Sequence, residues 1–190
     1  KRLYQDTFDY LRKEWEQQDT CSLVPSYHSP DKKDYTSYRY PCPVDDSTVV
    51  AVKSGLKDIN SLVTIVHGKE KRLSYIGSIN SRLDYRNGKI YWTEIVPGLR
   101  WTHENYSVLK CYDLKEGRIK SITPRQRYLS PSVDKNGKVA AVSRTTVDGK
   151  NQLVLVELED GKELFAFQVP DNAFIKELTF TDQDEVVAVA

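Results

Sequence analysis

The chain has 190 residues, which is enough for one domain with a sizeable core. Its 28 basic and 27 acidic residues leave a net charge of +1, which argues against a general nucleic-acid binder, because such proteins usually carry a clear basic excess. No apolar run approaches the roughly 20 residues that span a bilayer, so we expect no membrane insertion.

The first elements predicted along the chain are an amphipathic α-helix and a linker. In residues 1–18 the apolar side chains fall on one face of a helix and the opposite face is charged or polar. These apolar residues are Leu3, Phe8, Leu11 and Trp15. The passage that follows contains Pro25 and Pro30 and has no periodicity, which is typical of a linker. We therefore expect an N-terminal part that ends at residue 36.

From residue 37 onward the pattern changes to short strands separated by turns. The turn dipeptides are Asp45-Asp46, Asn87-Gly88, Asn136-Gly137, Asp148-Gly149 and Asp160-Gly161. Asn-Gly and Asp-Gly supply the positive φ angles of tight hairpin turns. Because almost every turn is of this kind, neighbouring strands are predicted to be antiparallel.

A similar apolar run recurs four times in this strand-rich part. The runs begin at Val49, Ile90, Val139 and Val186, at intervals of roughly 45 residues, and the first three are each followed by two more strand signals. That period with four strands per unit is typical of a β-propeller blade. The sequence thus predicts an all-β fold of propeller-like four-stranded antiparallel blades at 37–77, 78–124 and 125–171, with part of a fourth at 172–190. A β-sandwich is the alternative, but it does not require this recurrence.

Several short motifs along the blades are similar to those of a known protein family. They are Trp92, Glu94, Arg100-Trp101, Tyr106-Ser107, Tyr112 to Leu114, Thr123, Arg127-Tyr128 and Pro131. With them, the chain from about Tyr35 to its end resembles the TolB-type, WD-repeat-like β-propeller modules of bacterial cell-envelope proteins. It is most similar to modules that follow a helical or zinc-peptidase-like region. The resemblance implies a periplasmic or envelope-associated location, and a cytoplasmic one stays open.

Residue patterns that carry catalysis are not found in the sequence. His103-Glu104 lacks the second histidine of a zinc-peptidase motif, and no serine-hydrolase elbow or phosphate-binding glycine loop occurs. We therefore expect no enzymatic activity, no cofactor and no metal site in this chain. Cys21, Cys42 and Cys111 are widely spaced and are predicted to be thiols, with a single bridge such as Cys21 to Cys42 left open.

One connection between strands is the candidate binding site. Residues 97–106 form a longer connection than their counterparts in the other blades, and binding surfaces are often built on such loops. The candidate residues are Arg100, Trp101, His103, Glu104 and Tyr106, together with Glu94. Arg, Trp and Tyr are the types that dominate interface hot spots. In the alternative interpretation, Arg100 and Trp101 only hold the loop against its own blade, with Arg100 paired to Glu94.

These observations lead to one expected function and two alternatives. The expected function is a non-catalytic propeller scaffold or recognition module for a protein or peptide partner, within a larger exported envelope protein. The first alternative is an accessory propeller that gates substrate for a peptidase or other hydrolase domain outside this chain. The second is a glycan-binding module, because aromatic clefts bind sugars and the chain has 12 Tyr and 3 Trp.

Overall fold

The computed structural model of the chain describes residues 12–13, 35–79, 81–98 and 105–190. The chain divides into two compact units, Lys1–Asp31 and Lys32–Ala190. In the first unit only Arg12 and Lys13 are described, and both are helical and exposed. The predicted apolar helix face, Leu3, Phe8, Leu11 and Trp15, lies outside the described residues. No helix in the described part of the chain has the length and apolar character needed to cross a membrane.

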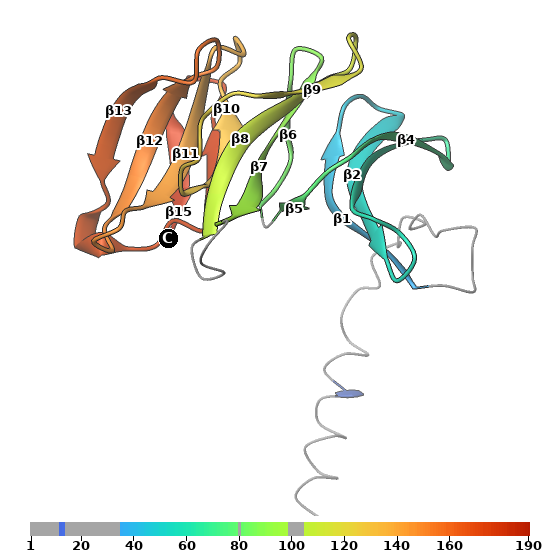
Figure 1. Ribbon diagram of the computed structural model, residues 1–190, viewed down its shortest axis with the longest axis horizontal. Coiled ribbons are helices and arrows are strands. Elements are labelled where there is room, and N and C mark those ends of the chain that lie inside the picture. The colour runs from blue at the N-terminus through green and yellow to red at the C-terminus, as the bar shows by residue number, and fades with distance from the viewer. Residues whose placement is uncertain (1–11, 14–34, 80, 99–104) are drawn as a thin grey trace, which may run out of the picture. The chain divides into compact units, whose positions relative to one another are not determined.

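The second unit consists of antiparallel sheets whose strands follow one another in chain order (Figure 1). The first blade contains β1 (Thr36–Pro43), β2 (Thr48–Gly55), β3 (Ser61–Val66) and β4 (Lys69–Tyr75). The second contains β5 (Ser78–Ile79), β6 (Asp84–Arg86), β7 (Lys89–Pro97), β8 (Asn105–Asp113) and β9 (Arg118–Ser121). The third contains β10 (Tyr128–Val133), β11 (Val139–Thr145), β12 (Asn151–Glu157) and β13 (Glu163–Gln168). The 3₁₀ turn η1 (Pro170–Asn172) leads to β14 (Glu177–Phe180) and β15 (Val186–Val189), which form two strands of a fourth blade. The expected all-β blades are confirmed.

The hairpin turns between the strands have two different geometries. His67 and Gly68 have φ angles of 46° and 75°, and Asn87 and Gly88 have 49° and 78°, so each pair has the two positive φ angles of a tight two-residue turn. At Asn136-Gly137 only the glycine has a positive φ, and its N–H donates to the carbonyl of Asp134. Both geometries reverse the chain between antiparallel strands.

Consecutive blades pack face to face through their buried strands. In β7, Ile90 and Trp92 are fully buried against the first blade, whereas Tyr91, which points to the opposite face, packs against the third. The first interface also contains Val50, Val52 and Leu62, and the second contains Leu109, Cys111, Val133 and Ala140. A strand covered on both faces needs apolar residues at successive positions. This explains the runs with little alternation that mark the repeat.

The first strands of the blades are also tied to one another by hydrogen bonds. The Val133 N–H of β10 donates to Asp84 Oδ2 of the second blade at 2.6 Å, and Arg86 Nε donates to the Val133 carbonyl at 3.2 Å. One blade further, the Phe180 N–H donates to Ser132 Oγ at 3.0 Å. Hydrophobic packing is not directional, so these bonds help to set how one blade is placed along the next.

Asp84 is expected to give folding a specific dependence on pH. Burial raises the pKa of its carboxyl above the usual value of 3.8, although the Val133 N–H and Arg86 act in the opposite direction. The folded state therefore holds this proton more tightly than the unfolded state, and the stabilisation present at acid pH is lost as pH rises through the raised pKa.

The variant Asp84→Asn tests this pH dependence. In Asp84→Asn the amide oxygen still accepts the Val133 N–H and the buried charge is removed. We expect the free energy of unfolding of the wild type, relative to Asp84→Asn, to fall between acid and neutral pH in denaturant titrations. Parallel pH profiles would contradict this assignment.

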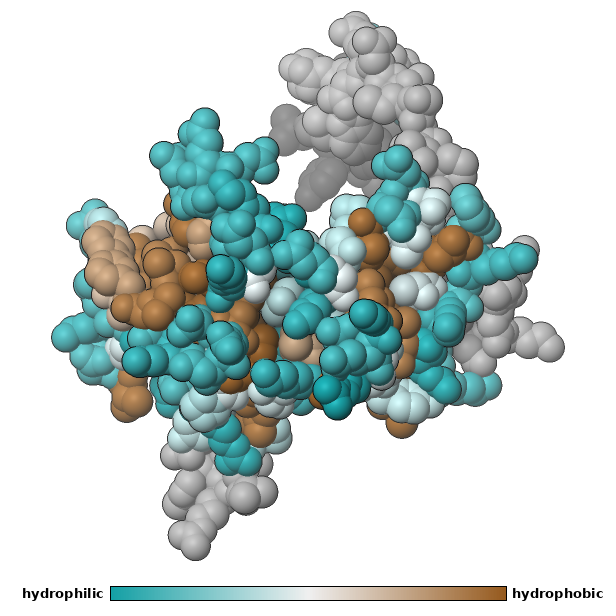
Figure 2. Space-filling view, turned by 90° about the horizontal axis from the view of Figure 1, so that it is seen from above, coloured by the Kyte–Doolittle hydropathy of each residue, from teal (hydrophilic) through white to brown (hydrophobic). Residues whose placement is uncertain are grey.

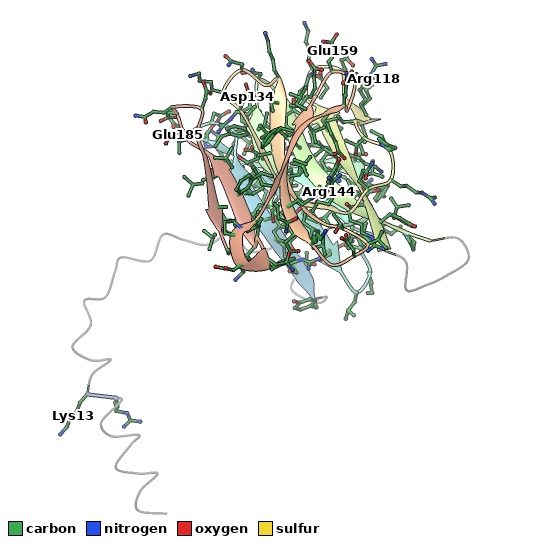
Figure 3. The ribbon with its side chains drawn as sticks, turned by 90° about the vertical axis from the view of Figure 1, so that its left-hand side faces the viewer. Lys13, Arg118, Asp134, Arg144, Glu159 and Glu185 are labelled. Carbon is green, nitrogen blue, oxygen red and sulfur yellow. The ribbon has the colours of Figure 1, made fainter. Side chains whose placement is uncertain are left out.

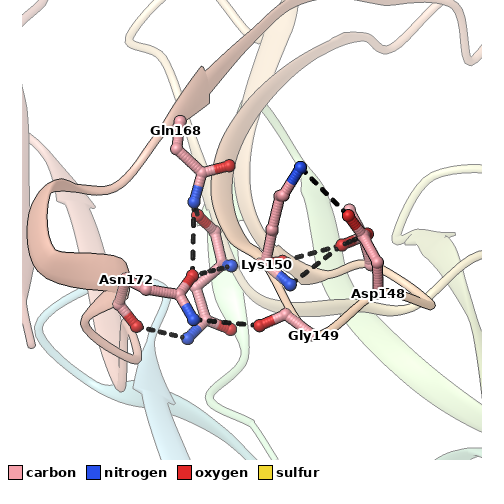
Figure 4. Close-up of polar contacts among 7 residues, drawn as sticks. Asp148, Gly149, Lys150, Gln168 and Asn172 are labelled. Atoms are coloured by element: carbon pink, nitrogen blue, oxygen red, sulfur yellow. Dashed lines mark hydrogen bonds and ion pairs between the residues drawn. The ribbon is translucent and has the colours of Figure 1, made fainter.

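A second set of bonds joins the third blade to the segment that leads to the fourth (Figure 4). Asn172 Nδ2 donates to the Gly149 carbonyl at 3.0 Å, and Asn172 Oδ1 accepts the Asn151 N–H at 2.7 Å and Gln168 Nε2 at 3.2 Å. Asp148 and Lys150 form an ion pair at 3.1 Å beside them. One asparagine thus holds the β11–β12 connection, the end of β13 and η1 together.

The third blade has an uncovered apolar surface on its outer strand. Phe165 and Phe167 of β13 are 56% and 48% exposed, and they share a sheet face with Leu155 and Leu153, their partners on β12. Nearer the first strand of the blade, Ala141 on the same face is fully buried. Figure 2 shows hydrophobic surface on the side where β13 lies in Figure 1.

Candidate functional site

The predicted binding loop lies between β7 and β8. β7 ends at Pro97 and β8 begins at Asn105, so the connection spans 98–104, against 56–60 in the first blade and 146–150 in the third. Four of the candidate residues, Arg100, Trp101, His103 and Glu104, lie outside the described residues. Their role therefore stays a prediction.

Glu94, at the base of this connection, is held in an internal ion pair. Its side chain is 11% exposed, and Oε1 accepts a hydrogen bond from Lys110 Nζ at 2.5 Å. Trp92 Nε1 donates to Oε2 at 3.3 Å. A Cβ atom at Gly77 would lie 2.8 Å from Glu94 Cδ, so only glycine leaves room for the carboxylate. This arrangement favours a structural role for Glu94.

Tyr106, the remaining candidate, lies on β8 opposite Val96 of β7. Its side chain is half-buried, and the guanidinium carbon of Arg127 lies 6.0 Å from the centre of its ring. Arg127 Nε is buried and has no hydrogen-bond partner in the part of the chain that the structure describes. The ring therefore contacts the segment leading to the third blade, which is compatible with a site at this end of β8.

The first strands of the blades enclose a central cavity of about 240 Å³. Residues from each of the four blades line it: Tyr40, Ser81, Arg82, Ser130, Pro131, Lys176, Glu177 and Leu178. In a four-stranded meander, the connections between second and third strands lie at the same end as the linkers between blades. Lys176 and Glu177 lie where such a linker enters β14. The cavity therefore extends toward the end of the sheets at which β7 ends and β8 begins.

A repeated sequence motif shapes the wall of the central cavity. Tyr40 precedes Pro41 in β1, and Ser130 precedes Pro131 in β10. At both places the pairing register shifts, and the two residues have φ angles of 54° and 48°. Bulges of this kind re-aim a side chain, and a non-glycine residue in the left-handed region costs about 1–3 kcal/mol. The same local distortion thus places one side chain of the first blade and one of the third at the cavity.

The second and fourth blades supply the charges of the central cavity. The break between β5 and β6 places Ser81 and Arg82 there, and Ser81 Oγ lies 2.8 Å from Thr93 Oγ1. Arg82 Nη2 is 2.6 Å from Glu177 Oε2, with side chains 71% and 38% exposed. Ser130 Oγ donates to the carbonyl of Lys176 at 2.7 Å. The lining of the cavity therefore contains two cations, one carboxylate and the hydroxyl groups of three side chains.

The central cavity was not among the sequence-based predictions. The repeated segments Tyr38 to Pro41 and Tyr128 to Pro131 are the signal that could have identified it. In both, the first tyrosine donates its hydroxyl to a glutamate of the last strand: Tyr38 to Glu70 at 2.6 Å and Tyr128 to Glu163 at 2.5 Å. Lys53 pairs with Glu70, and Arg144 with Glu163. Proline, tyrosine and an ion pair thus recur as a unit in the first and third blades.

Comparisons with solved structures show a β-propeller fold similar to that of TolB. The chain is similar to TolB from Acinetobacter baumannii (TM-score 0.52, 12% identity, 68% of this chain and 31% of that one). It is also similar to a putative TolB from Agrobacterium tumefaciens (TM-score 0.53, 15% identity, 84% of this chain and 58% of that one). A third similar structure is the β-propeller domain of the Trilobed protease from Pyrococcus furiosus (TM-score 0.52, 14% identity, 72% of this chain and 43% of that one). The chain spans about a third to just over half of these proteins. No family model and no curated protein matches the sequence.

Proposed function

We propose that this chain is a non-catalytic recognition module that binds a protein or peptide partner at the central cavity. The observation that carries the proposal is the convergence of four blades on one cavity with exposed Arg82, Lys176 and Glu177. A ligand held there contacts several blades at once, which favours specific recognition on a rigid scaffold. The net positive charge of the lining favours a segment with an acidic side chain or a terminal carboxylate.

The hydroxyl groups of the central cavity are engaged in ways that favour binding over catalysis. Ser130 donates to a backbone carbonyl and Ser81 is bonded to Thr93, so neither faces a general base. An activated serine needs a base within hydrogen-bond reach. The described residues that line the cavity include no histidine.

The connection 98–104 is proposed as a second binding element of the same surface. It follows β7 at the end toward which the central cavity extends. Arg100, Trp101, His103 and Glu104 would then add contacts beside the central cavity, with Tyr106 at the start of β8. We further propose that the module belongs to a larger exported protein of the periplasm or cell envelope, which the similarity to TolB supports.

An accessory role in a peptidase is the second candidate function. It is favoured by the similarity to the propeller domain of the Trilobed protease and to an acylaminoacyl peptidase (TM-score 0.52, 15% identity, 72% of this chain and 25% of that one). In that case the central cavity would contact the substrate of a catalytic domain outside this chain. The two functions predict different partners for the same surface.

Peptide selection tests the proposed function. A displayed library of random peptides is selected on the purified chain, and enriched peptides are measured by fluorescence polarisation. We expect acidic or carboxylate-terminated peptides, and a loss of affinity of about 10- to 100-fold in Arg82→Ala, because one charge-assisted hydrogen bond is worth about 1.5–3 kcal/mol. Arg118→Ala is the matched control, since Arg118 is equally exposed and pairs with Glu116 away from the cavity.

The outcomes separate the two candidate functions. Equal binding by wild type and Arg82→Ala would contradict recognition at the central cavity. Cleavage of any enriched peptide by the purified chain would contradict a non-catalytic module. Enrichment of peptides that a peptidase from the same source cleaves would favour the accessory role.

A further inference from the structure

A second cavity, of about 440 Å³, lies between the second and third blades. It is lined by Lys89, Tyr91, Cys111, Lys120, Ile122, Gly137, Lys138, Glu157, Leu158 and Glu159. It shares no residue with the central cavity. Figure 3 shows Glu159 at the same end of the sheets as Asp134 and Glu185, which lie in the turns between first and second strands. This end is opposite the one toward which the central cavity extends. This inter-blade cavity is therefore a separate place for a ligand.

The floor of the inter-blade cavity is apolar but contains the hydroxyl of one tyrosine. Tyr91 is 3% exposed and lines the cavity. Burial raises the pKa of Tyr91 to about 12, so the phenol stays protonated and can donate. Cys111, Ile122 and Leu158 lie beside it and are also buried. The Tyr91 hydroxyl thus adds one hydrogen-bond donor to a floor that is otherwise apolar.

The mouth of the inter-blade cavity carries three lysines. Lys89 Nζ is 3.8 Å from Asp113, and Lys120 Nζ donates to the Glu159 carbonyl oxygen at 3.5 Å. Lys138 lines the cavity from the β10–β11 turn, where its backbone N–H donates to Asp134. The carboxylates of Glu157 and Glu159 also line the cavity, so the net charge of the lining is positive. Such a mouth favours an anion over a neutral or cationic ligand.

We propose that the inter-blade cavity binds a small organic anion, a carboxylate or a phosphate ester, that has an apolar body. The charged group lies at the lysines, and the body packs on Ile122 and Leu158. The Tyr91 hydroxyl donates to a polar atom of the ligand. The volume lies within the range of about 300–1,000 Å³ that is usual for small-molecule sites, which combine an apolar lining with a few placed polar groups.

Alkylation of Cys111 provides the readout, because this thiol lines the cavity. Cys42 serves as the internal reference, since it is buried between the first and second blades and does not line the cavity. The folded chain is treated with iodoacetamide, and modification of each cysteine is followed by mass spectrometry. We expect benzoate and phenyl phosphate to slow the alkylation of Cys111 several-fold and to leave Cys42 unchanged. Benzamide, which matches benzoate in shape but is neutral, is expected to have no effect.

Variants of the lining test the role of each group. Lys138→Gln is expected to weaken the protection by benzoate about tenfold, because a charge-assisted contact is lost. Tyr91→Phe is expected to leave the protection by benzoate nearly unchanged, because benzoate has no polar atom beyond the carboxylate that lies at the lysines. Lys71→Gln, an exposed lysine on β4, is the matched control and should behave as wild type.

Three results would overturn the proposal. The first is equal protection by benzoate and benzamide, or protection by neither benzoate nor phenyl phosphate. The second is protection by inorganic phosphate as strong as that by phenyl phosphate, which would exclude a role for the apolar body. The third is an unchanged response to benzoate in Lys138→Gln.

Discussion

Trp92→Ala is expected to lower the free energy of unfolding by about 3–5 kcal/mol, the range measured for truncating a large buried aromatic side chain. Trp92 is fully buried between the first and second blades, where it packs with Val50, Val52 and Leu62. Because the side chain packs against residues of both blades, its removal leaves a cavity at their interface. Denaturant titration followed by circular dichroism provides the measurement.

Trp92→Phe is the control for this substitution. It keeps an aromatic ring in the interface but removes the indole N–H that donates to Glu94. We expect a loss clearly smaller than for alanine. A loss below about 1 kcal/mol in Trp92→Ala would be typical of a surface substitution and would contradict tight packing between these blades.

Lys110→Met is expected to destabilise the fold by a similar amount, about 3–5 kcal/mol at neutral pH. The substitution keeps most of the side-chain volume but leaves the Glu94 carboxylate, 11% exposed, without its cation. A buried charge that loses its partner is strongly unfavourable.

The double variant Lys110→Met, Glu94→Gln tests whether the unpaired charge causes the effect. Its free energy of unfolding should recover most of the loss, because neutral or apolar replacements of a buried ion pair are often tolerated. If the double variant is as unstable as Lys110→Met alone, packing around Lys110 causes the loss and the ion pair does not.

The blade pattern could be predicted because a blade has a simple sequence code. Continuous apolar runs such as Ile90 to Trp92 indicate strands that are buried on both faces, and Asn87-Gly88 marks a tight hairpin. Both features act through neighbouring residues, so the order of strands follows from local patterns. The length of the 98–104 connection could be predicted for the same reason.

The contacts that shape the sites could not be predicted, because they depend on register and on bulges. The pairing of Glu94 with Arg100, part of the alternative interpretation of the loop, stays a prediction, because Arg100 lies outside the described residues. Among the described residues the partner of Glu94 is Lys110, which reaches it from the neighbouring strand β8. The central cavity depends on register shifts at Tyr40 and Ser130, which move a side chain relative to the regular alternation of a strand. Only comparison between blades, through the shared tyrosine and proline, could have indicated them.

The most direct test of recognition at the central cavity is an NMR titration of the 190-residue chain with a selected peptide. Recognition by the first strands predicts that the backbone amide shifts concentrate at Tyr40, Ser81, Ser130 and Leu178, which come from four different blades. It also predicts little change at Lys89 and Lys138 of the inter-blade cavity. Shifts confined to the exposed face of β13, with none at the first strands, would contradict the account.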